Sequence, residues 1–482
     1  MAQQVSKPPE HDELQPHTSQ PLTRQRTRLS MAGIICLLVL IGVVILASTG
    51  LLVISLVRGT SQSVALVGTG TPTSQQTQVP GQTGTPTQAN SPAITPTATP
   101  PIFRPGNTLA TPLQVPGGHF IIYEQQNYLY MISTAPGATP QLLSTPGYVY
   151  NHAVPPILTP TGQLLYSGEG IWQADIFSGT ANLLATLDPN QVITSMALSS
   201  DGTTIAWTTE PSNGSGMDNI YAGSLDSPTK VFEQASVKCP CFRIFSFMNG
   251  SGKQGNSTLL LTDGQQSLEA IQFGLWSFNI TKPLATPQPI LDGDSLQGPL
   301  SLSPYGNTLL YSTYEAQVPV PTDESVPDDV ATLNYANSLN VAALQGQPLT
   351  LGTPQIILPK QQVLSNHAAY HWVTTPIFTP DAQTLVYVEF SSQAQAPYDR
   401  SSALYVVHIS GTGGHLLVGK PQLLATSTAG LLELGAWLNS HVLALYADNS
   451  IYVLDVQSGA VATIVQTNAY ARVIAVIGQG GI

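Results

Sequence analysis

The feature that most constrains the fold of this 482-residue chain is a short pattern that recurs seven times in its C-terminal part. Each copy is an aliphatic residue, usually followed by an aromatic one, and then three residues later a polar or small residue before another aliphatic. Successive copies start 42 to 65 residues apart, close to the about 40 to 50 residues of a β-propeller blade. The pattern predicts an all-β, seven-bladed propeller, with six or eight blades as the alternative counts. The copies begin at Leu129-Tyr130, Ile171-Trp172, Ile220-Tyr221, Leu275-Trp276, Leu339-Asn340, Leu404-Tyr405 and Ile451-Tyr452.

Each copy has similar surroundings. A turn unit flanked by two apolar strands precedes several copies, as at Ser199-Ser200-Asp201-Gly202 and at residues 158–166, 302–311 and 378–387. Proline and glycine in these units suit the second and last positions of a type I turn. A short strand follows the copies, as at Pro140-Gln141-Leu142-Leu143. The order predicts four antiparallel strands in each blade.

The first blade lacks a leading strand, because residues 120–123 follow directly on a region without strand pattern. An apolar run at residues 472–477 comes after the seventh blade and has no blade of its own. We therefore expect this run to become the innermost strand of blade one, which would close the ring and pair the exposed sheet edges.

These residues resemble a known family. The Ser-Pro-Asp-Gly-like turn and the later Ile-Tyr-x-x-Asp-Ile strand are similar to the TolB-like (PD40, WD40-like) β-propeller repeats, over most of residues 118–478. Blade four departs from the pattern at Asn249-Gly250-Ser251-Gly252, and blade six has Ala382 in the glycine position. The resemblance implies a fold rather than one activity, since the family ranges from periplasmic binding proteins to the propeller halves of peptidases.

A second constraint lies near the N-terminus. Residues 31–57 carry no charge, and 27 residues at about 1.5 Å each are long enough for a membrane-spanning helix. A cleaved signal peptide is the alternative, but its apolar region is only about 7 to 15 residues long. Arg24, Arg26 and Arg28 precede the span, whereas Arg58 alone follows it closely. The positive-inside rule therefore predicts a single-pass cell-membrane protein with a cytoplasmic N-terminus and an extracytoplasmic propeller.

The remaining segments complete the predicted organisation. Residues 1–30 form a polar tail without hydrophobic periodicity, which we expect to be disordered. Residues 58–105 are rich in Thr, Pro and Gln and are typical of a disordered stalk. We expect residues 106–482 to form the propeller head. Residues 31–57 are the predicted contact with the membrane.

The charge balance bears on partners. Only 9% of the residues are charged, and the net charge is −12. Residues 106–482 contain 9 Lys and Arg against 24 Asp and Glu, a balance of −15. Proteins that grip nucleic acid through its phosphates need basic surfaces, so no nucleic-acid partner is expected. The expected ligand is a protein, a peptide or a glycan, whose identity the sequence does not reveal.

Few residues in the sequence indicate a catalytic, metal-binding or ligand-binding site. His367 and His371 have the i, i+4 spacing of zinc ligands, but the glutamate of the metalloprotease motif is missing and a strand is expected there. We interpret Tyr370, His371 and His152 instead as candidate ligand contacts at the mouth of the propeller channel, because each precedes an inner strand. No catalytic residue, metal site or cofactor is expected.

Two other groups of residues have a candidate structural or metal-binding role. Cys239 and Cys241 are the only cysteines outside the predicted span, and they are candidates for a disulfide, either as a local structural bridge or in a redox role. Acidic residues between positions 313 and 337 are interpreted as a solvated loop, with calcium as the alternative, although their spacing fits no EF-hand.

The sequence as a whole predicts a non-enzymatic binding, sensing or protein-interaction module. Two alternatives stay open. One is a propeller hydrolase or lyase whose acidic residues are dispersed around the channel, and the other is a structural cell-surface protein.

Overall fold

The computed structural model describes residues 103–105 and 113–478, with gaps at 237–239, 249–256, 265–271, 283–284, 318–334, 360–368, 394–395, 412–414 and 428–431. The predicted tail and membrane span, and the stalk up to residue 102, lie outside these ranges. All elements within them are β-strands, and none of the described residues forms a helix long and apolar enough to cross a membrane. The described residues belong to one compact unit.

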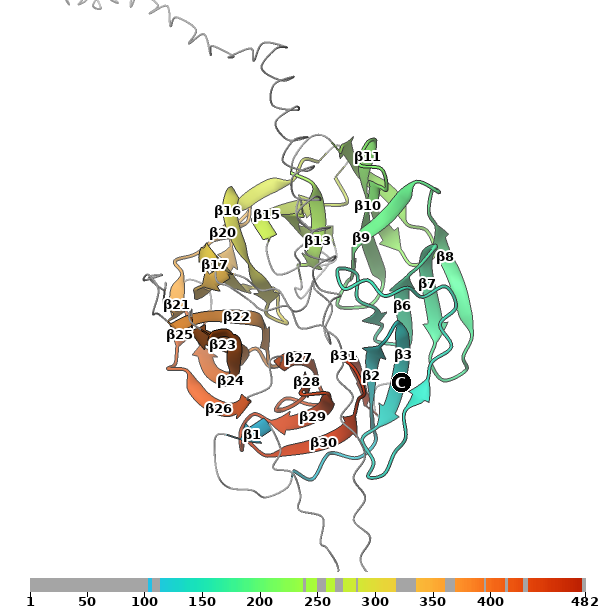
Figure 1. The fold of residues 1–482 in the computed structure, drawn as a ribbon. Helices are drawn as coiled ribbons and strands as arrows, with labels where there is room; N and C mark the ends of the chain where they lie inside the picture. Colours follow the sequence, from blue (N-terminus) through green and yellow to red (C-terminus); the bar gives the residue numbers. More distant parts are fainter. Residues whose placement is uncertain are drawn as a thin grey trace, which may run out of the picture. The chain divides into compact units, whose positions relative to one another are not determined.

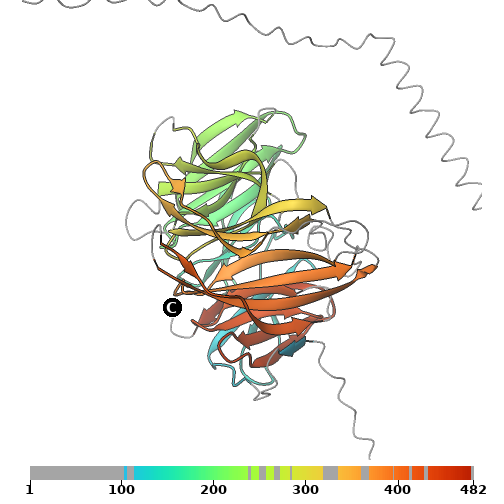
Figure 2. The same ribbon diagram turned by 90° about the vertical axis from the view of Figure 1, so that its left-hand side faces the viewer.

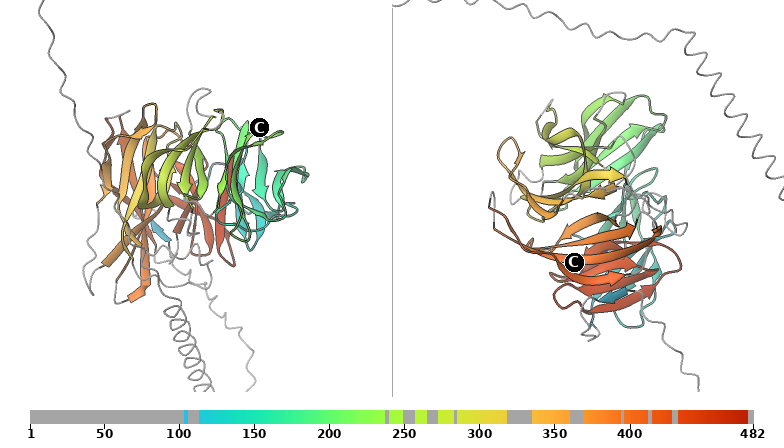
Figure 3. Two further views of the ribbon diagram at one scale, coloured as in Figure 1. Left: turned by 90° about the horizontal axis from the view of Figure 1, so that it is seen from above. Right: turned by 60° about the vertical axis from the view of Figure 1, so that its left-hand side comes forward.

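The strands form antiparallel blades that succeed one another around a ring in chain order (Figure 1). Seen from above, the strands of successive blades lie roughly along one common axis, alternating in direction within each blade (Figure 3, left). The fold is a seven-bladed β-propeller.

The first three blades are regular four-stranded sheets. Their strands, from the innermost outwards, are β31 (Ala471–Gly478), β2 (His119–Gln125), β3 (Tyr128–Ser133) and β4 (Gln141–Leu142) in blade one; β5 (Ile157–Leu158), β6 (Gln163–Ser167), β7 (Gly170–Asp175) and β8 (Ala181–Thr186) in blade two; and β9 (Gln191–Leu198), β10 (Thr204–Pro211), β11 (Met217–Ser224) and β12 (Thr229–Ala235) in blade three.

Blades four and five are joined by one long strand. The first residues of β16 pair with β15, and its last residues pair with β17, so the two blades form one hydrogen-bonded sheet. The repeat predicts two separate four-stranded sheets here, so this continuity differs from the expectation. The strands of this sheet are β13 (Phe242–Phe247), β14 (Thr258–Asp263), β15 (Gln272–Asn279), β16 (Gln288–Leu302), β17 (Thr308–Gln317), β18 (Tyr335–Asn337), β19 (Leu339–Gln345), β20 (Thr350–Leu351) and β21 (Gln355–Leu358).

Blade six has longer strands than blade seven. Its orange strands extend beyond the red strands of blade seven in Figure 2, because β24 has 15 residues whereas β29 has six. The strands of blade six are β22 (Ala369–Phe378), β23 (Thr384–Gln393), β24 (Ala396–Ser410), β25 (Leu417–Val418) and β26 (Gln422–Ser427), and those of blade seven are β27 (Leu432–Trp437), β28 (Val442–Ala447), β29 (Ser450–Asp455) and β30 (Val461–Gln466).

A short strand, β1 (Phe103–Pro105), pairs with β26 at the outer edge of blade six. These three residues belong to the predicted stalk, residues 58–105, at its C-terminal end. Their pairing with β26 covers backbone groups that an edge strand would otherwise leave exposed.

All seven copies of the repeat begin on the third strand of a blade. Their first residues are buried in every case, with exposed fractions between 0% and 2%. The aromatic second position pairs across to the second strand, and the rings are stacked in four blades. These stacked pairs are Tyr123 with Tyr130, Tyr166 with Trp172, Trp207 with Tyr221, and Tyr387 with Tyr405. Cross-strand pairs of this kind stabilise a sheet, which explains why an aromatic residue recurs at the second position of the repeat.

The ring closes through the C-terminal strand. Strand β31 pairs antiparallel with β2, from His119 opposite Gly478 to Gln125 opposite Ala471. Red β31 therefore lies beside blue-green β2 in Figure 1, although the two are at opposite ends of the head. This is the pairing that the apolar run at residues 472–477 predicts.

Candidate functional site

A buried ion pair lies where the two ends of the head meet. The register of β31 and β2 places Arg472 directly opposite Glu124. Arg472 Nη2 lies 3.2 Å from Glu124 Oε2, and the two side chains are only 8% and 2% exposed. A buried charge is costly unless it is paired and hydrogen-bonded, so this pair ties the closing strand to its neighbour in one register.

The connection between β4 and β5 completes the surroundings of this pair. The hydroxyl of Tyr148 donates to Glu124 Oε1, and Arg472 Nη1 donates to the carbonyl oxygen of His152 at 3.0 Å. The guanidinium carbon of Arg472 lies 5.9 Å from the centre of the Tyr150 ring, within the range of a cation–π interaction. Both carboxylate oxygens of Glu124 therefore have partners within the protein.

Blade seven contributes a second carboxylate. Glu433 is the second residue of the inner strand β27, as Arg472 is of β31, and the hydroxyl of Tyr470 donates to Glu433 Oε2 at 2.5 Å. The Tyr470 ring also packs edge-on against Tyr446, with ring centres 5.3 Å apart. We call the group of Glu124, Tyr148, Tyr150, His152, Glu433, Tyr470 and Arg472 the closure cluster.

Burial sets the protonation states in the closure cluster. Burial, followed by the charge of Arg472, lowers the pKa of His152 to about 3, so its ring is neutral at pH 7. Burial, followed by the neighbouring glutamate, raises the pKa of Tyr148 beside Glu124 and the pKa of Tyr470 beside Glu433. Burial alone would lower the pKa of Arg472, but Glu124 and Glu433 more than offset this effect and the net shift is upwards.

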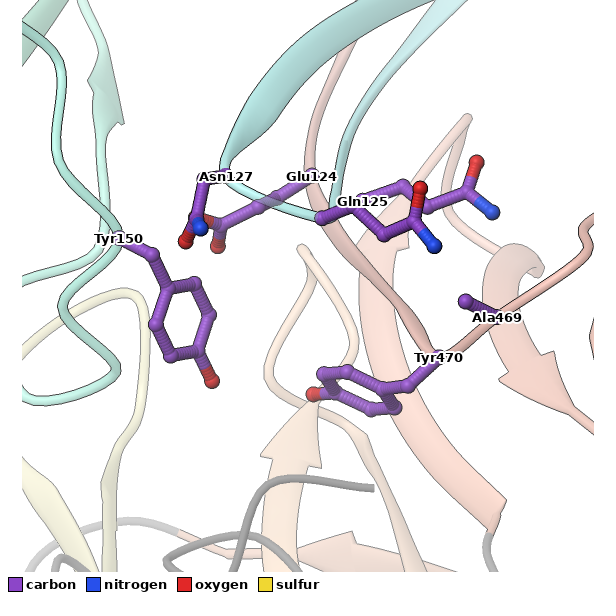
Figure 4. Close-up of a pocket in the computed structure, with 7 residues that line it drawn as sticks. Glu124, Gln125, Asn127, Tyr150, Ala469 and Tyr470 are labelled. Atoms are coloured by element: carbon purple, nitrogen blue, oxygen red, sulfur yellow. The ribbon is translucent and has the colours of Figure 1, made fainter. Parts of the chain in front are cut away.

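A pocket of about 240 Å³ opens beside the closure cluster (Figure 4). We call it the tyrosine pocket; it is lined by residues 124–127, Tyr150 and residues 469–470. Tyr150 and Tyr470 turn their hydroxyl groups towards one another across the pocket, and Glu124 and Asn127 lie above them in Figure 4.

The rim of the tyrosine pocket is a tight turn between β2 and β3. Gln126 and Asn127 have φ values of 51° and 65°, a left-handed backbone conformation that residues other than glycine rarely adopt. Both residues are exposed. The turn thus presents two amide side chains at the pocket entrance.

A second hollow of about 430 Å³ shares Tyr150 with the tyrosine pocket. It is lined by residues 149–152, 167–168, Leu187 and residues 191–193, between blades two and three. His152 lines this hollow, and its backbone carbonyl accepts a hydrogen bond from Arg472. Its role as a ligand contact stays a prediction.

The other candidates from the sequence are placed differently. Tyr370 and His371 are the second and third residues of β22, the inner strand of blade six, and His367 lies outside the described residues. Cys239 also lies outside them, so its disulfide with Cys241 stays a prediction. The backbone N–H of Cys241 donates to Asp263 Oδ1 at 2.9 Å.

Most of the acidic segment that could bind calcium, residues 318–334, is not among the described residues. In the part of the chain that the structure does describe, no three His, Cys, Asp or Glu side chains gather closely enough to hold a metal ion.

Five residues of the closure cluster are not among the candidates that the sequence predicts: Glu124, Tyr148, Glu433, Tyr470 and Arg472. A signal was present for one pair, because Glu124 and Arg472 are charged residues in otherwise apolar strands that were predicted to pair. No linear signal links Glu433 to Tyr470, since their contact depends on the packing of blade seven against blade one.

Comparison with known proteins bears on the fold. No protein-family model matches the chain, and no curated protein sequence matches it. Solved structures similar to it include a protein from Lactobacillus plantarum (13% identity, TM-score 0.46, covering 75% of this chain and 99% of the other) and the periplasmic gluconolactonase of Pseudomonas aeruginosa (13%, 0.42, 74% and 99%). A protein described as a TolB from Agrobacterium tumefaciens is also similar (13%, 0.32, 65% and 93%). At this identity the likenesses concern the fold alone.

Proposed function

We propose that this protein is a membrane-anchored, extracytoplasmic β-propeller that binds a partner without catalysing a reaction. Residues 31–57 would anchor it, and the ligand would be a protein, peptide or glycan rather than nucleic acid. The observation that carries the proposal is the tyrosine pocket, in which aromatic rings and amide side chains surround a carboxylate already held by the protein.

The state of Glu124 favours binding over catalysis. A general base or nucleophile needs a lone pair directed at the substrate. Here Oε2 accepts from Arg472 and Oε1 accepts from Tyr148. Each oxygen thus has a lone pair engaged within the protein, and the side chain is only 2% exposed, so the carboxylate serves to hold β31 in place. The exposed groups at the rim of the pocket are the amides of Gln126 and Asn127.

One observation favours an enzyme as the second candidate. Two carboxylates, Glu124 and Glu433, converge on Arg472, and dispersed acidic residues at a channel mouth are what a propeller hydrolase or lyase would use. Replacing Glu433 with Gln distinguishes the two functions. A binding protein would still capture its partner with this variant, though more weakly if the partner is basic, because one negative charge is lost; an enzyme would lose turnover and keep its fold.

A photo-crosslinking amino acid at position 126 tests the binding function. Gln126 lies at the entrance of the tyrosine pocket, whereas Gln457 lies in the exposed turn between β29 and β30, at the other end of the strands. A crosslinker at position 126 in intact cells should capture a discrete partner, and one at position 457 should not. Equal capture from both positions would count against a specific site.

Deletion of residues 31–57 tests the anchor. The shortened chain should move from the membrane fraction to the soluble fraction, because 27 uncharged residues provide the only proposed contact with the bilayer. The matched control removes 27 residues from the predicted stalk, residues 62–88, and should stay in the membrane. An external protease should digest the head of the intact protein on whole cells, and protection of the head would contradict the proposed orientation.

A further inference from the structure

We infer that the tyrosine pocket binds a basic side chain, a lysine or arginine, presented by a partner protein. This inference rests on the proposed binding function and names its ligand class. It depends on the charge around the pocket, its aromatic walls and its size.

The local charge favours a cation. The closure cluster contains two carboxylates, Glu124 and Glu433, and one guanidinium, Arg472, which leaves a formal charge of −1. His152 adds no charge at pH 7, because its pKa is about 3. A cation entering the pocket therefore meets one negative charge in a site partly shielded from water, where electrostatic interactions are stronger than on an open surface.

The head as a whole reinforces this preference. Residues 106–482 carry 24 acidic and 9 basic side chains. A net charge of −15 attracts basic partners over a distance of about 10 Å, and it repels acidic ligands such as phosphates and acidic glycans.

The walls of the pocket suit a cationic side chain. The ring of Tyr150, which already makes a cation–π interaction with Arg472 at 5.9 Å, forms one aromatic wall. Tyr470 provides a second aromatic wall (Figure 4). At the rim, the side-chain carbonyl groups of Gln126 and Asn127 are acceptors for the N–H groups of a lysine or arginine.

The size of the pocket limits the ligand to one side chain or one sugar ring. Pockets for drug-sized ligands usually measure about 300 to 1,000 Å³, whereas the tyrosine pocket measures about 240 Å³. This volume suits one side chain or one sugar ring, and the local charge favours the basic side chain. A single basic side chain from a folded or extended partner fits both the volume and the charge.

The test uses the full-length chain in detergent micelles with small probes, observed by saturation-transfer NMR. The probes are N-acetyl-arginine amide and N-acetyl-lysine amide, with N-acetyl-glutamine amide as the uncharged control and N-acetylglucosamine as the sugar. The basic probes should bind with a dissociation constant on the order of 1 mM, and raising the salt from about 0.05 M to about 0.5 M should weaken them severalfold. The uncharged amide should show no saturation transfer.

Two substitutions at the rim give opposite expectations. Gln126→Lys should weaken the basic probes at least tenfold by repulsion, and Gln457→Lys, the same change in a distant turn, should leave them unaffected. Asn127→Asp adds a carboxylate at a position where Asp tolerates the left-handed conformation, and it should strengthen the basic probes severalfold.

The outcomes separate this inference from the proposed function. If N-acetylglucosamine binds and the basic probes do not, or if Asn127→Asp leaves the basic probes unchanged, the inference is wrong. Crosslinking at position 126 would in that case still support a binding protein with another ligand. If crosslinking is equal at positions 126 and 457, the binding function itself fails.

Discussion

Arg472 and Glu124 are separated by 348 residues in the chain and lie directly opposite one another in the pairing of β31 with β2, with Nη2 and Oε2 3.2 Å apart. The pair joins β31, the last strand in the chain, to β2, the second strand of blade one. The ring closure and the candidate binding site thus depend on the same two side chains.

Replacing Arg472 alone should destabilise the propeller strongly. Arg472→Met leaves the buried carboxylate of Glu124 without its counter-charge, a change that typically costs about 3 to 5 kcal/mol of unfolding free energy. Chemical denaturation of the wild-type and variant chains measures the difference. Lys420→Met, at an exposed position, is the control and should change stability by less than about 0.5 kcal/mol.

The double variant Arg472→Met with Glu124→Leu separates the charge effect from packing. Replacing both partners of a buried ion pair with apolar residues is often neutral, so the double variant should be more stable than Arg472→Met alone. A double variant as unstable as the single one would show that the hydrogen bonds to His152 and Tyr148 matter more than the unpaired charge.

Removing the closing strand should unfold the head. A chain ending at Tyr470 lacks β31 and exposes the edge of β2, whereas a chain ending at Gly478 keeps every described strand. The first truncation should lose the cooperative thermal transition, and the second should melt like the intact protein. Circular dichroism during heating measures both, and equal melting of the two truncations would contradict closure through β31.

Much of the fold could be predicted because each copy of the repeat marks a buried position on the third strand of a blade. A residue such as Leu129 or Ile451, which begins a copy, is completely buried on the third strand of its blade, so the same physical demand recurs at each position. The closing strand could be predicted because an apolar run without a blade needs a partner. The fusion of blades four and five could not, since Asp292-Gly293-Asp294 within residues 288–302 has the composition of a turn and favours two short strands over the one long strand observed.

The candidate site was harder to predict. Arg472 binds the backbone carbonyl of His152, and a carbonyl group is present in every residue, so the sequence contains no signal for this contact. The place of His152 before an inner strand predicts a ligand contact, whereas the contact that the structure describes for it with Arg472 is made by its backbone carbonyl. Tyr470 meets Glu433 only because the last blade packs against the first.

The pH dependence of stability should reveal His152. Its pKa is about 3 in the folded protein and about 6.5 when unfolded, so the unfolded state binds the additional proton first as the pH falls. Its contribution to stability is complete above pH 6.5 and decreases by about 1.4 kcal/mol per pH unit below that, down to about pH 3. Urea denaturation between pH 7 and pH 4.5 should therefore show a shallower loss in His152→Gln than in the wild type. His415→Gln, which replaces an exposed histidine, is the control, and identical slopes in wild type and His152→Gln would refute the neutral, buried state of this ring.

The turn of blade six offers a stabilising substitution. Ala382 occupies the position of Gly202 in blade three and has a φ of 57°, where a Cβ atom costs about 1 to 2 kcal/mol. Ala382→Gly relieves this strain but increases the freedom of the unfolded chain, so we expect a net gain of about 0.5 to 1 kcal/mol in unfolding free energy.

Gly202→Ala is the reciprocal change. It introduces the same strain at a φ of 72° and places a Cβ atom 2.6 Å from Cδ of Pro160, so it should destabilise the protein by more than Ala382→Gly stabilises it. Denaturation curves of the two variants measure both effects. If Ala382→Gly lowers the stability, the turn of blade six does not store strain, and the departure from the repeat at this position has no energetic cost.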